Sequence, residues 1–260
     1  MRSRPVESSQ VPFAVTDDAV LGGRLKLLQP VRGHRAGHDA ILLAAAAPKS
    51  VHAIELGSGV GAAGLALLVR GAARDVLLVD ADADLVRLAA ANAERNNYGG
   101  RAEAVACEVE RVARRGGPAR PATASADLVI MNPPFNDPET RRVSPDAARR
   151  RAHAAPVTSL EHWVAAAARL LKDSGRLVLI HRPEAIATIL ALVEGQFGAI
   201  EIIPVHALAS GPAIRIILRA QKGKRTPPVI RRCIVLAGDD GRPTHEADEI
   251  LRGAAALDPA

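Results

Sequence analysis

The chain has 260 residues, of which 48% are hydrophobic and only 2% aromatic, and it carries a formal net charge of +6 with a sequence pI near 10.0. This length fits one large domain with additions, and Ala, Leu and Val must build its core. The basic balance favours a polyanionic partner such as nucleic acid. A general bias of the genome toward Arg and Ala would give the same charge.

The cysteines and the apolar runs argue against several classes of protein. Cys107 and Cys233 lie far apart and form no Cys-x-x-Cys unit, so neither a disulfide framework nor a metal site is expected. Residues 1–15 lack the apolar core of a signal peptide, and no run approaches the roughly 18 apolar residues of a membrane span. We therefore expect a cytoplasmic protein with no membrane association and no obligate protein partner.

The N-terminal part is expected to lie outside the core of the fold. Residues 1–20 are predicted to be a flexible tail, and residues 21–50 an N-terminal cap on the core. Within the cap, residues 25–30 could form a short edge strand. A helix is predicted to begin at His38 or Asp39 and to continue to Pro48, and a simple N-cap is the alternative to a functional role for Asp39.

Strands and helices alternate over the predicted core, residues 51–221. Residues 200–205 and 213–220 read as strands joined by a hairpin-like connection, so one antiparallel strand closes an otherwise parallel sheet. The C-terminal extension, residues 222–260, holds an apolar run at 229–236 and a short helix near 244–251. The pattern predicts a single α/β domain with seven strands and helices on both faces. The other expected strands are 51–56, 75–80, 102–107, 126–131 and 176–181, and the expected helices are 60–70, 82–97, 158–172 and 183–194.

A glycine-rich loop connects the first core strand to the first core helix, with the sequence Glu-Leu-Gly-Ser-Gly-Val-Gly at residues 55–61. Glycines allow a tight turn and the close approach of a ligand, and the free N–H groups at the start of a helix then face that ligand. Gly59-x-Gly61-x-x-Gly64 followed by Asp80 also matches a dinucleotide fingerprint, so an NAD-dependent oxidoreductase is an alternative. The carboxylate of Glu55 counts against it, because it suits a cationic ligand group.

A second stretch, Asn132-Pro133-Pro134-Phe135, follows the apolar run at residues 126–131. It therefore lies at the carboxyl end of a predicted buried strand, where open α/β sheets place ligands. The asparagine amide and the carbonyls before the prolines supply hydrogen-bond acceptors, the prolines stiffen the turn, and the phenylalanine ring offers a flat apolar face. These features suit a planar base with an exocyclic amine, although an ordinary strand-to-loop turn would have the same sequence.

The glycine loop resembles the S-adenosylmethionine motif of Rossmann-like class I methyltransferases. The resemblance implies that cofactor, with Glu55 beside the amino group of its methionine moiety, Asp80 on the ribose hydroxyls and Glu108 near the adenine. The cofactor-binding residues that it implies are Arg35, Asp39, Glu55, Gly57, Ser58, Gly59, Gly61, Asp80, Ala81, Glu108 and Asn132.

Asn-Pro-Pro-Phe resembles the catalytic tetrad of amino-directed methyltransferases, which implies catalytic roles for Asn132, Pro133, Pro134 and Phe135. Those enzymes modify exocyclic adenine nitrogens or glutamine amides. The stretch at residues 29–44, Gln-Pro-x-x-Gly-His-Arg-x-Gly-His-Asp-Ala-x-Leu-Leu-Ala, resembles the N-terminal signature of bacterial tRNA1(Val) adenine-N6 methyltransferases, which modify the adenine beside the anticodon. The resemblance implies a tRNA substrate.

Several alternatives stay open at this point. A protein glutamine N5-methyltransferase of the release-factor type shares the tetrad, although that group usually has Tyr at the position of Phe135. An rRNA or DNA amino-methyltransferase, an oxidoreductase and a non-catalytic RNA-binding module are the others. For an RNA substrate, the basic residues expected to follow phosphates are Arg141, Arg142, Arg149, Arg150, Arg151, Lys222, Lys224 and Arg225. The same side chains could simply be solvated.

Overall fold

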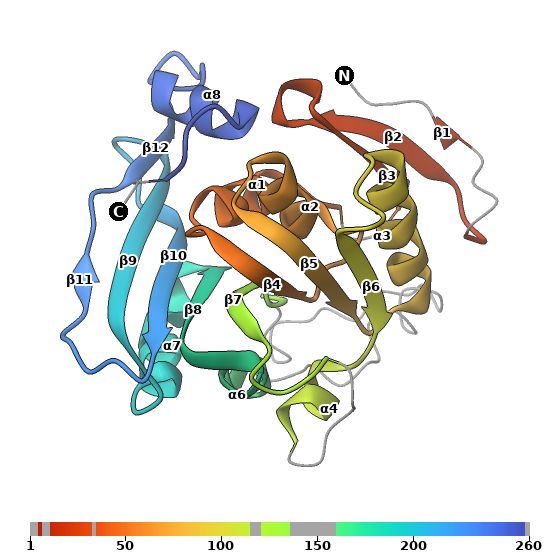
Figure 1. Cartoon of the computed structure of the whole chain (residues 1–260). Coiled ribbons are helices and arrows are strands. Elements are labelled where there is room, and N and C mark those ends of the chain that lie inside the picture. Colours follow the sequence, from red (N-terminus) through yellow and green to blue (C-terminus); the bar gives the residue numbers. More distant parts are fainter. Residues whose placement is uncertain (1–4, 7–10, 33–34, 115–120, 136–159, 258–260) are drawn as a thin grey trace, which may run out of the picture.

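A computed structural model describes residues 5–6, 11–32, 35–114, 121–135 and 160–257 (Figure 1). Gly33 and His34 of the N-terminal motif lie outside the described residues. So do the expected phosphate contacts at Arg141, Arg142, Arg149, Arg150 and Arg151, and the expected start of a helix at residue 158.

The main sheet of the described chain has the strand order β11-β9-β10-β8-β7-β4-β5-β6, and β12 also pairs with β9. Strand β10 runs antiparallel to β8 and β9, and the other pairs are parallel. Strands β4 to β10 therefore form the predicted seven-stranded sheet with one antiparallel strand, and β11 and β12 extend it at one edge. The strands are β4 (Ser50–Leu56), β5 (Ala73–Asp80), β6 (Ala102–Ala106), β7 (Ala126–Met131), β8 (Leu171–His181), β9 (Phe197–Leu208), β10 (Ala213–Lys222), β11 (Val229–Ile230) and β12 (Ile234–Ala237).

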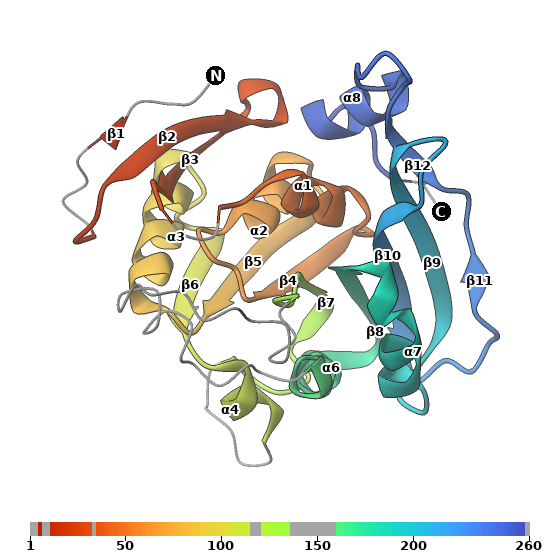
Figure 2. The same ribbon diagram turned by 180° about the vertical axis from the view of Figure 1, so that it is seen from behind.

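Helices cover both faces of this sheet, as Figures 1 and 2 show from opposite sides. Along β7, Leu128 and Ile130 join the core under one helical layer, whereas Val129 and Met131 join the core under the other. This alternation follows from the two-residue period of a strand that is buried on both faces. The first layer contains α1 (His38–Ala45), α2 (Ala62–Val69) and α3 (Ala83–Arg95), and the second contains α4 (Val109–Ala113), α6 (Leu160–Leu170), the short helix η3 (Pro183–Ala185) and α7 (Ile186–Val193). The α/β fold with helices on both faces is confirmed.

The N-terminal segment differs from the predicted flexible tail. Strands β1 (Pro5–Val6), β2 (Val15–Val20) and β3 (Leu25–Pro30) form a separate antiparallel sheet, with the short helix η1 (Leu21–Gly23) between β2 and β3. Asp17 and Asp18 of β2 make the sequence of this segment polar. Asp17 pairs with Arg95 of α3, and Asp18 pairs with Arg35, so distant arginines compensate both charges.

Two asparagines of α3 attach this small sheet to the core. The Oδ1 atom of the fully buried Asn92 accepts from the amide of Leu28 at 2.7 Å, and its Nδ2 donates to the carbonyls of Leu28 at 3.1 Å and Val60 at 3.0 Å. One helical turn later, Asn96 exchanges the same two hydrogen bonds with the backbone of Lys26. The four residues from Asn92 to Asn96 rise about 6 Å along the helix, and the two residues from Lys26 to Leu28 span about the same length of strand. The two asparagine side chains therefore have the right spacing to bond to these two residues of β3.

The C-terminal extension packs against the core. Helix α8 (His245–Arg252) begins at the N-cap Thr244, whose Oγ1 accepts from the amide of Ala247 at 3.1 Å. Three arginines donate to backbone carbonyls in residues 250–257: Arg24 of the N-terminal segment to Gly253, and Arg70 and Arg219 of the core to Ile250 and Ala255 and to Leu257, respectively. None of the helices that the structure describes combines the length and apolar character that a membrane crossing requires.

We expect Asn92→Ala to lower the free energy of unfolding by about 2–4 kcal/mol, because it leaves buried backbone groups of β3 and of the glycine loop without partners. Asn96→Ala is the matched control, since Asn96 lies one turn further along on a half-buried part of the helix and should cost less. Urea unfolding of both variants measures the difference. Equal losses of unfolding free energy in the two variants would show that the hydrogen bond from Asn92 to Val60 contributes nothing to stability.

Candidate functional site

Three segments with polar side chains meet at the carboxyl edge of the sheet. Strand β4 lies between β5 and β7, and Leu56 is in register with both Val79 and Met131. The glycine loop leaves β4, Asp80 ends β5, and Asn132 follows β7, so all three lie next to one another. The chain order reverses between β4 and β7, and such a switch point is where open α/β sheets bind ligands.

The glycine loop is held in one conformation by its neighbours. Gly57, Gly59 and Gly61 all have left-handed backbone angles, with φ of 66°, 53° and 82°. The amide of Ser58 donates to the carbonyl of Val79 at 2.9 Å, which folds the loop over the end of β5. A Cβ atom at Gly57 would also overlap the ring of the buried Trp163 from α6. Gly57 therefore has to be glycine for two reasons, its φ angle and the aromatic ring beneath it.

The carboxylate of Asp80 joins this loop to the neighbouring strand. Its Oδ2 accepts from the amide of Gly59 at 2.7 Å, and its Oδ1 accepts from the amide of Asp82 at 2.9 Å. Burial raises the pKa of Asp80 above its ordinary value, against the lowering effect of these backbone hydrogen bonds. Each carboxylate oxygen can accept more than one hydrogen bond, so Asp80 can hold the loop and still accept from ligand hydroxyls.

Glu55, the first residue of the glycine loop motif, faces helix α2. Ile54 and Leu56 pack under the α4–α6 layer, so Glu55 between them faces α2 on the other side of the sheet. It is 5% exposed, and its Oε2 accepts from the amide of Gly64 at 2.7 Å. Burial raises the pKa of Glu55 to about 8, so its carboxyl group is largely protonated at neutral pH. Its contact with the cofactor stays a prediction.

The same contact explains the third glycine of the apparent dinucleotide fingerprint. A Cβ atom at Gly64 would overlap the side chain of Leu78, and it would lie 2.8 Å from Oε2 of Glu55 and 3.1 Å from Val76. The close packing of α2 on β4 and β5 thus requires glycine at this position, without any bound pyrophosphate.

The other residues expected to bind the cofactor either bond to other parts of the chain or are exposed. Arg35 donates to Thr16 and to the carbonyl of Pro30, each at 2.8 Å, so it belongs to the N-terminal sheet. Asp39 accepts from Nε of Arg215 at 2.9 Å. Ala81 is exposed next to Asp80, and Glu108 is exposed after β6. Their roles toward a cofactor stay predictions, although Ala81 and Glu108 both lie at the carboxyl edge.

Asn132 presents a buried acceptor to this edge. Its Oδ1 atom meets no hydrogen-bond donor among the described residues, and neither does the buried Oγ of Ser58 in the glycine loop. A buried carbonyl oxygen without a donor costs free energy, so a ligand N–H at this position would be favourable. Pro133 is buried and Pro134 exposed, and the tetrad continues β7 directly.

Phe135 is surrounded by side chains that were not among the site residues predicted from the sequence. Its ring meets the ring of His181 edge to face, with centroids 4.9 Å apart, and the Cζ atoms of Arg182 and Arg215 lie 5.4 and 4.9 Å from its centroid. Burial lowers the pKa of His181, and the two nearby guanidinium charges lower it further, which favours the neutral imidazole. His181 could have been found, because it ends a predicted strand beside β7.

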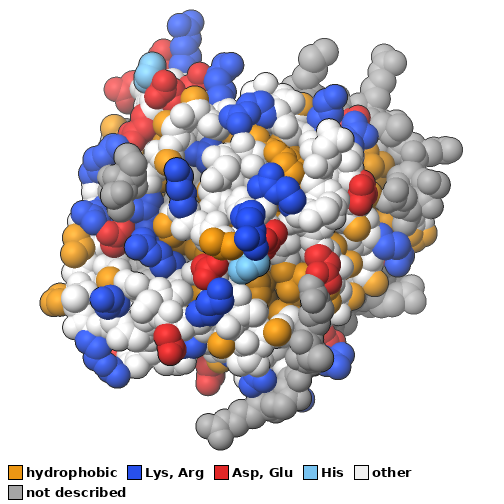
Figure 3. Space-filling model, in the orientation of Figure 1, with side chains coloured by type: hydrophobic (Ala, Val, Ile, Leu, Met, Phe, Trp, Pro, Cys, Tyr) orange, Lys and Arg blue, Asp and Glu red, His pale blue; other side chains and the backbone are white. Residues whose placement is uncertain are grey.

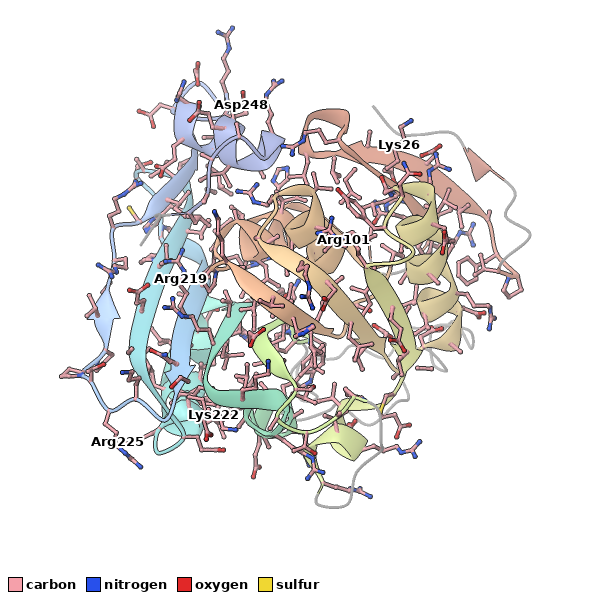
Figure 4. The ribbon with its side chains drawn as sticks, in the orientation of Figure 1. Lys26, Arg101, Arg219, Lys222, Arg225 and Asp248 are labelled. Carbon is pink, nitrogen blue, oxygen red and sulfur yellow. The ribbon has the colours of Figure 1, made fainter. Side chains whose placement is uncertain are left out.

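Of the basic residues expected to follow RNA phosphates, Lys222, Lys224 and Arg225 belong to the described part of the chain and lie away from the carboxyl edge. Their contacts with RNA stay predictions. Lys222 ends β10, and because β10 is antiparallel, this end lies at the amino edge of the sheet, opposite Asn132. Figure 4 shows Lys222 and Arg225 together at that end of the sheet. The Nζ atom of Lys222 donates to the carbonyl of Leu171 at 2.7 Å, whereas Lys224 and Arg225 are exposed. Figure 3 shows Lys and Arg side chains spread over one face with acidic side chains between them.

A cleft of about 740 Å³ opens at the amino edge of the sheet, opposite the carboxyl edge where Asn132 lies. It is lined by residues near the starts of β4, β5 and β6, among them His52, Asp75 and Arg101, the last of which Figure 4 labels. Asp75 contacts His52 and pairs with Arg74 at 3.0 Å. This cleft is thus separate from the polar groups at the carboxyl edge.

We expect Gly57→Ala to weaken binding at the glycine loop much more than Gly71→Ala weakens it. Both glycines have nearly the same φ, 66° and 65°, but a Cβ atom at Gly71 meets nothing within 4 Å. Both variants carry the strain of a left-handed residue, about 1–2 kcal/mol, and only Gly57→Ala also displaces Trp163. Thermal unfolding and calorimetry with S-adenosylmethionine test this, and equal effects of the two variants would contradict the role of Trp163.

We expect Glu55→Gln to change the pH dependence of stability. Because the pKa of Glu55 is raised from 4.5 to about 8, the folded protein keeps a proton that the unfolded chain has lost between these pH values. The contribution of Glu55 to the free energy of unfolding therefore falls as the pH rises through this window. Glu55→Gln removes that fall, so the variant gains relative to the original chain toward pH 8. Parallel curves in urea unfolding would contradict the raised pKa.

The comparisons with known proteins agree with this geometry. The crystal structure of a predicted O-methyltransferase, protein Atu636 from Agrobacterium tumefaciens, matches with a TM-score of 0.69 and 25% identity, covering 84% of this chain and 98% of that one. The structure of P. horikoshii TYW2 in complex with MeSAdo matches with a TM-score of 0.55 and 14% identity, covering 84% of this chain and 74% of that one. The comparison with curated proteins finds no match.

The family model named methyltransferase small domain matches residues 36–206, more than half of the chain. This range contains the glycine loop, Asp80 and the Asn132 tetrad. The left-handed glycines, the half-buried carboxylate at the end of β5 and the unpaired Ser58 hydroxyl among the described residues fit the cofactor of that family. The chain belongs to the methyltransferase small domain family, and it is a methyltransferase that uses S-adenosylmethionine on a Rossmann-like class I fold.

Proposed function

We propose that this protein methylates the exocyclic N6 amine of an adenine in RNA, and that the RNA is a tRNA modified next to its anticodon, as in the tRNA1(Val) type. The observation that carries the proposal is the buried Oδ1 of Asn132, which meets no donor among the described residues. The tRNA assignment is supported by the resemblance of residues 29–44 to the N-terminal signature of that group and by the net charge of +6.

The chemistry requires a poor nucleophile to be activated. The lone pair of an adenine amine is delocalised into the ring, so the nitrogen is planar and weakly nucleophilic. The Asn132 side-chain oxygen and the Pro133 carbonyl would accept its two N–H groups and favour a pyramidal nitrogen. The prolines limit the backbone angles of the turn, so that both acceptors are in place before the substrate binds.

The reaction then depends on alignment. The bound cofactor supplies an electrophilic methyl group on a sulfonium. Asn132 follows β7 directly beside the glycine loop after β4, which supports a reaction between the activated amine and a cofactor bound at that loop. Fixing two reactants in this way supplies several kcal/mol of the barrier reduction. The methylated amine can release its proton to water, and Phe135 would orient the base by stacking, worth roughly 1–3 kcal/mol.

We expect Asn132→Ala to reduce the single-turnover rate of methyl transfer to a tRNA transcript by roughly 10²–10³-fold, because one acceptor is lost from the reacting amine. Affinity for S-adenosylmethionine and the unfolding temperature should hardly change, since the side chain supports no packing in the described core. Calorimetry and thermal unfolding serve as controls. A variant that keeps the original rate would contradict the mechanism.

The same assay identifies the substrate. A glutamine side-chain amide offers the same pair of N–H groups to Asn132, so the tetrad alone does not separate RNA from protein substrates. Transfer of labelled methyl to tRNA, with N6-methyladenosine found by mass spectrometry of the nucleosides, is the expected result. Label incorporated into a protein fraction and absent from RNA would overturn the RNA assignment.

A further inference from the structure

Two arginines from different strands meet beside Phe135. Arg182 follows β8, and Arg215 lies near the start of β10. Because β10 is antiparallel to β8 with Ile216 opposite His181, the next position of the ladder brings Arg215 and Arg182 together. Both guanidinium groups lie within about 6 Å of the Phe135 ring, where the face of an aromatic ring attracts a cation.

Only one of the two arginines has an ion-pair partner. Asp39, in the first turn of α1, pairs with Arg215 at 2.9 Å, and both side chains are about one quarter exposed. Arg182 is exposed and forms no salt bridge with a carboxylate in the described part of the chain, although the exposed Glu184 lies near enough for its charge to act on His181. An added anion would pair with Arg182 and relieve its repulsion with Arg215.

The position of these arginines points to the substrate. In the sheet order β10-β8-β7-β4, Arg215 lies two strands beyond β7 and three beyond the β4 glycine loop. With neighbouring strands about 4.8 Å apart, this is roughly 10 Å from the strand of Asn132 and 14 Å from that of the loop. The pair thus lies on the side of Asn132 that faces away from the cofactor loop.

We infer that Arg182 and Arg215 bind a backbone phosphate of the RNA next to the nucleotide whose base reaches Asn132, and that Asp39 is a positioning residue for Arg215. This inference rests on the proposed function. In Arg215, Nε donates to Asp39 and Nη1 to the carbonyl of Ile214 at 2.8 Å, which leaves further N–H groups of its five for a phosphate. These groups lie in the plane of the guanidinium, so packing over a ring need not consume them.

The test is the salt dependence of RNA binding. Fluorescence anisotropy with a labelled, unmodified tRNA anticodon stem-loop is measured over a range of salt concentrations for Arg182→Ala, Arg215→Ala and the control Arg242→Ala. Arg242 is 86% exposed on the C-terminal extension. We expect each of the first two variants to weaken binding roughly tenfold and to reduce the slope of log affinity against log salt by about 1, and the control to change neither. Unchanged slopes in both would overturn the inference.

Asp39 is tested by a double-mutant cycle. Asp39→Asn should weaken RNA binding in the original chain but cause no further loss when combined with Arg215→Ala, because it acts through that arginine. Additive losses in RNA binding would overturn the positioning role.

The two proposals fail in different ways. If the original protein binds the stem-loop through these arginines but methylates no RNA, the phosphate site stands and the proposed function is wrong. If it methylates tRNA adenine while the arginine variants bind as the original does, the function stands and the phosphate site is wrong. Since Arg182 is exposed after a strand end, Arg182→Ala should fold even if Arg215→Ala does not.

Discussion

The hydrogen bond from the amide of Gly59 to the carboxylate of Asp80 is the contact on which the site depends. It joins the loop after β4 to the end of β5, and it holds that loop open toward the carboxyl edge. Trp163 supports the loop at Gly57, and Glu55 supports the first turn of α2 at Gly64. A loop with three left-handed glycines has little conformational preference of its own, so these supports must supply its shape.

The segments outside the central sheet are tied to this same region. Asn92 bonds both to β3 and to the carbonyl of Val60, so the N-terminal sheet and the glycine loop share one fully buried side chain. The C-terminal extension is held through its backbone carbonyls by one arginine of the N-terminal segment and two of the core. Buried backbone groups need partners, and long polar side chains provide them where no neighbouring strand is available.

The carboxyl edge divides into two halves around Asn132. On one side the glycine loop and Asp80 provide glycines and a carboxylate, which suit a cofactor with ribose hydroxyls. On the other side His181, Arg182 and Arg215 surround Phe135. The arginines over Phe135 also mean that a base stacking on this ring has to share it with a guanidinium. The two halves follow the order of the strands in the sheet, because the polar residues of each half lie at the ends of neighbouring strands.

Much of this arrangement was already determined by the sequence. Apolar runs with a two-residue or 3.6-residue period predicted the strands and helices of the core, because burial on both faces of a sheet is a local property of each segment. The tight glycine turn after the first core strand and the Asn-Pro-Pro-Phe turn after the fourth were also predicted, because glycine and proline act on the backbone locally. The seven-stranded sheet with one antiparallel strand followed from their order along the chain.

Only the tertiary structure decided which distant side chains meet. Residues 15–20 form a strand because Arg35 and Arg95 compensate its two aspartates, and neither partner is close in sequence. Glu55 faces α2 because of its place in the alternation of β4. The register of β10 against β8 sets Arg215 beside Arg182 at the site. Such pairings depend on strand register and on contacts between segments that are far apart along the chain, which no local pattern records.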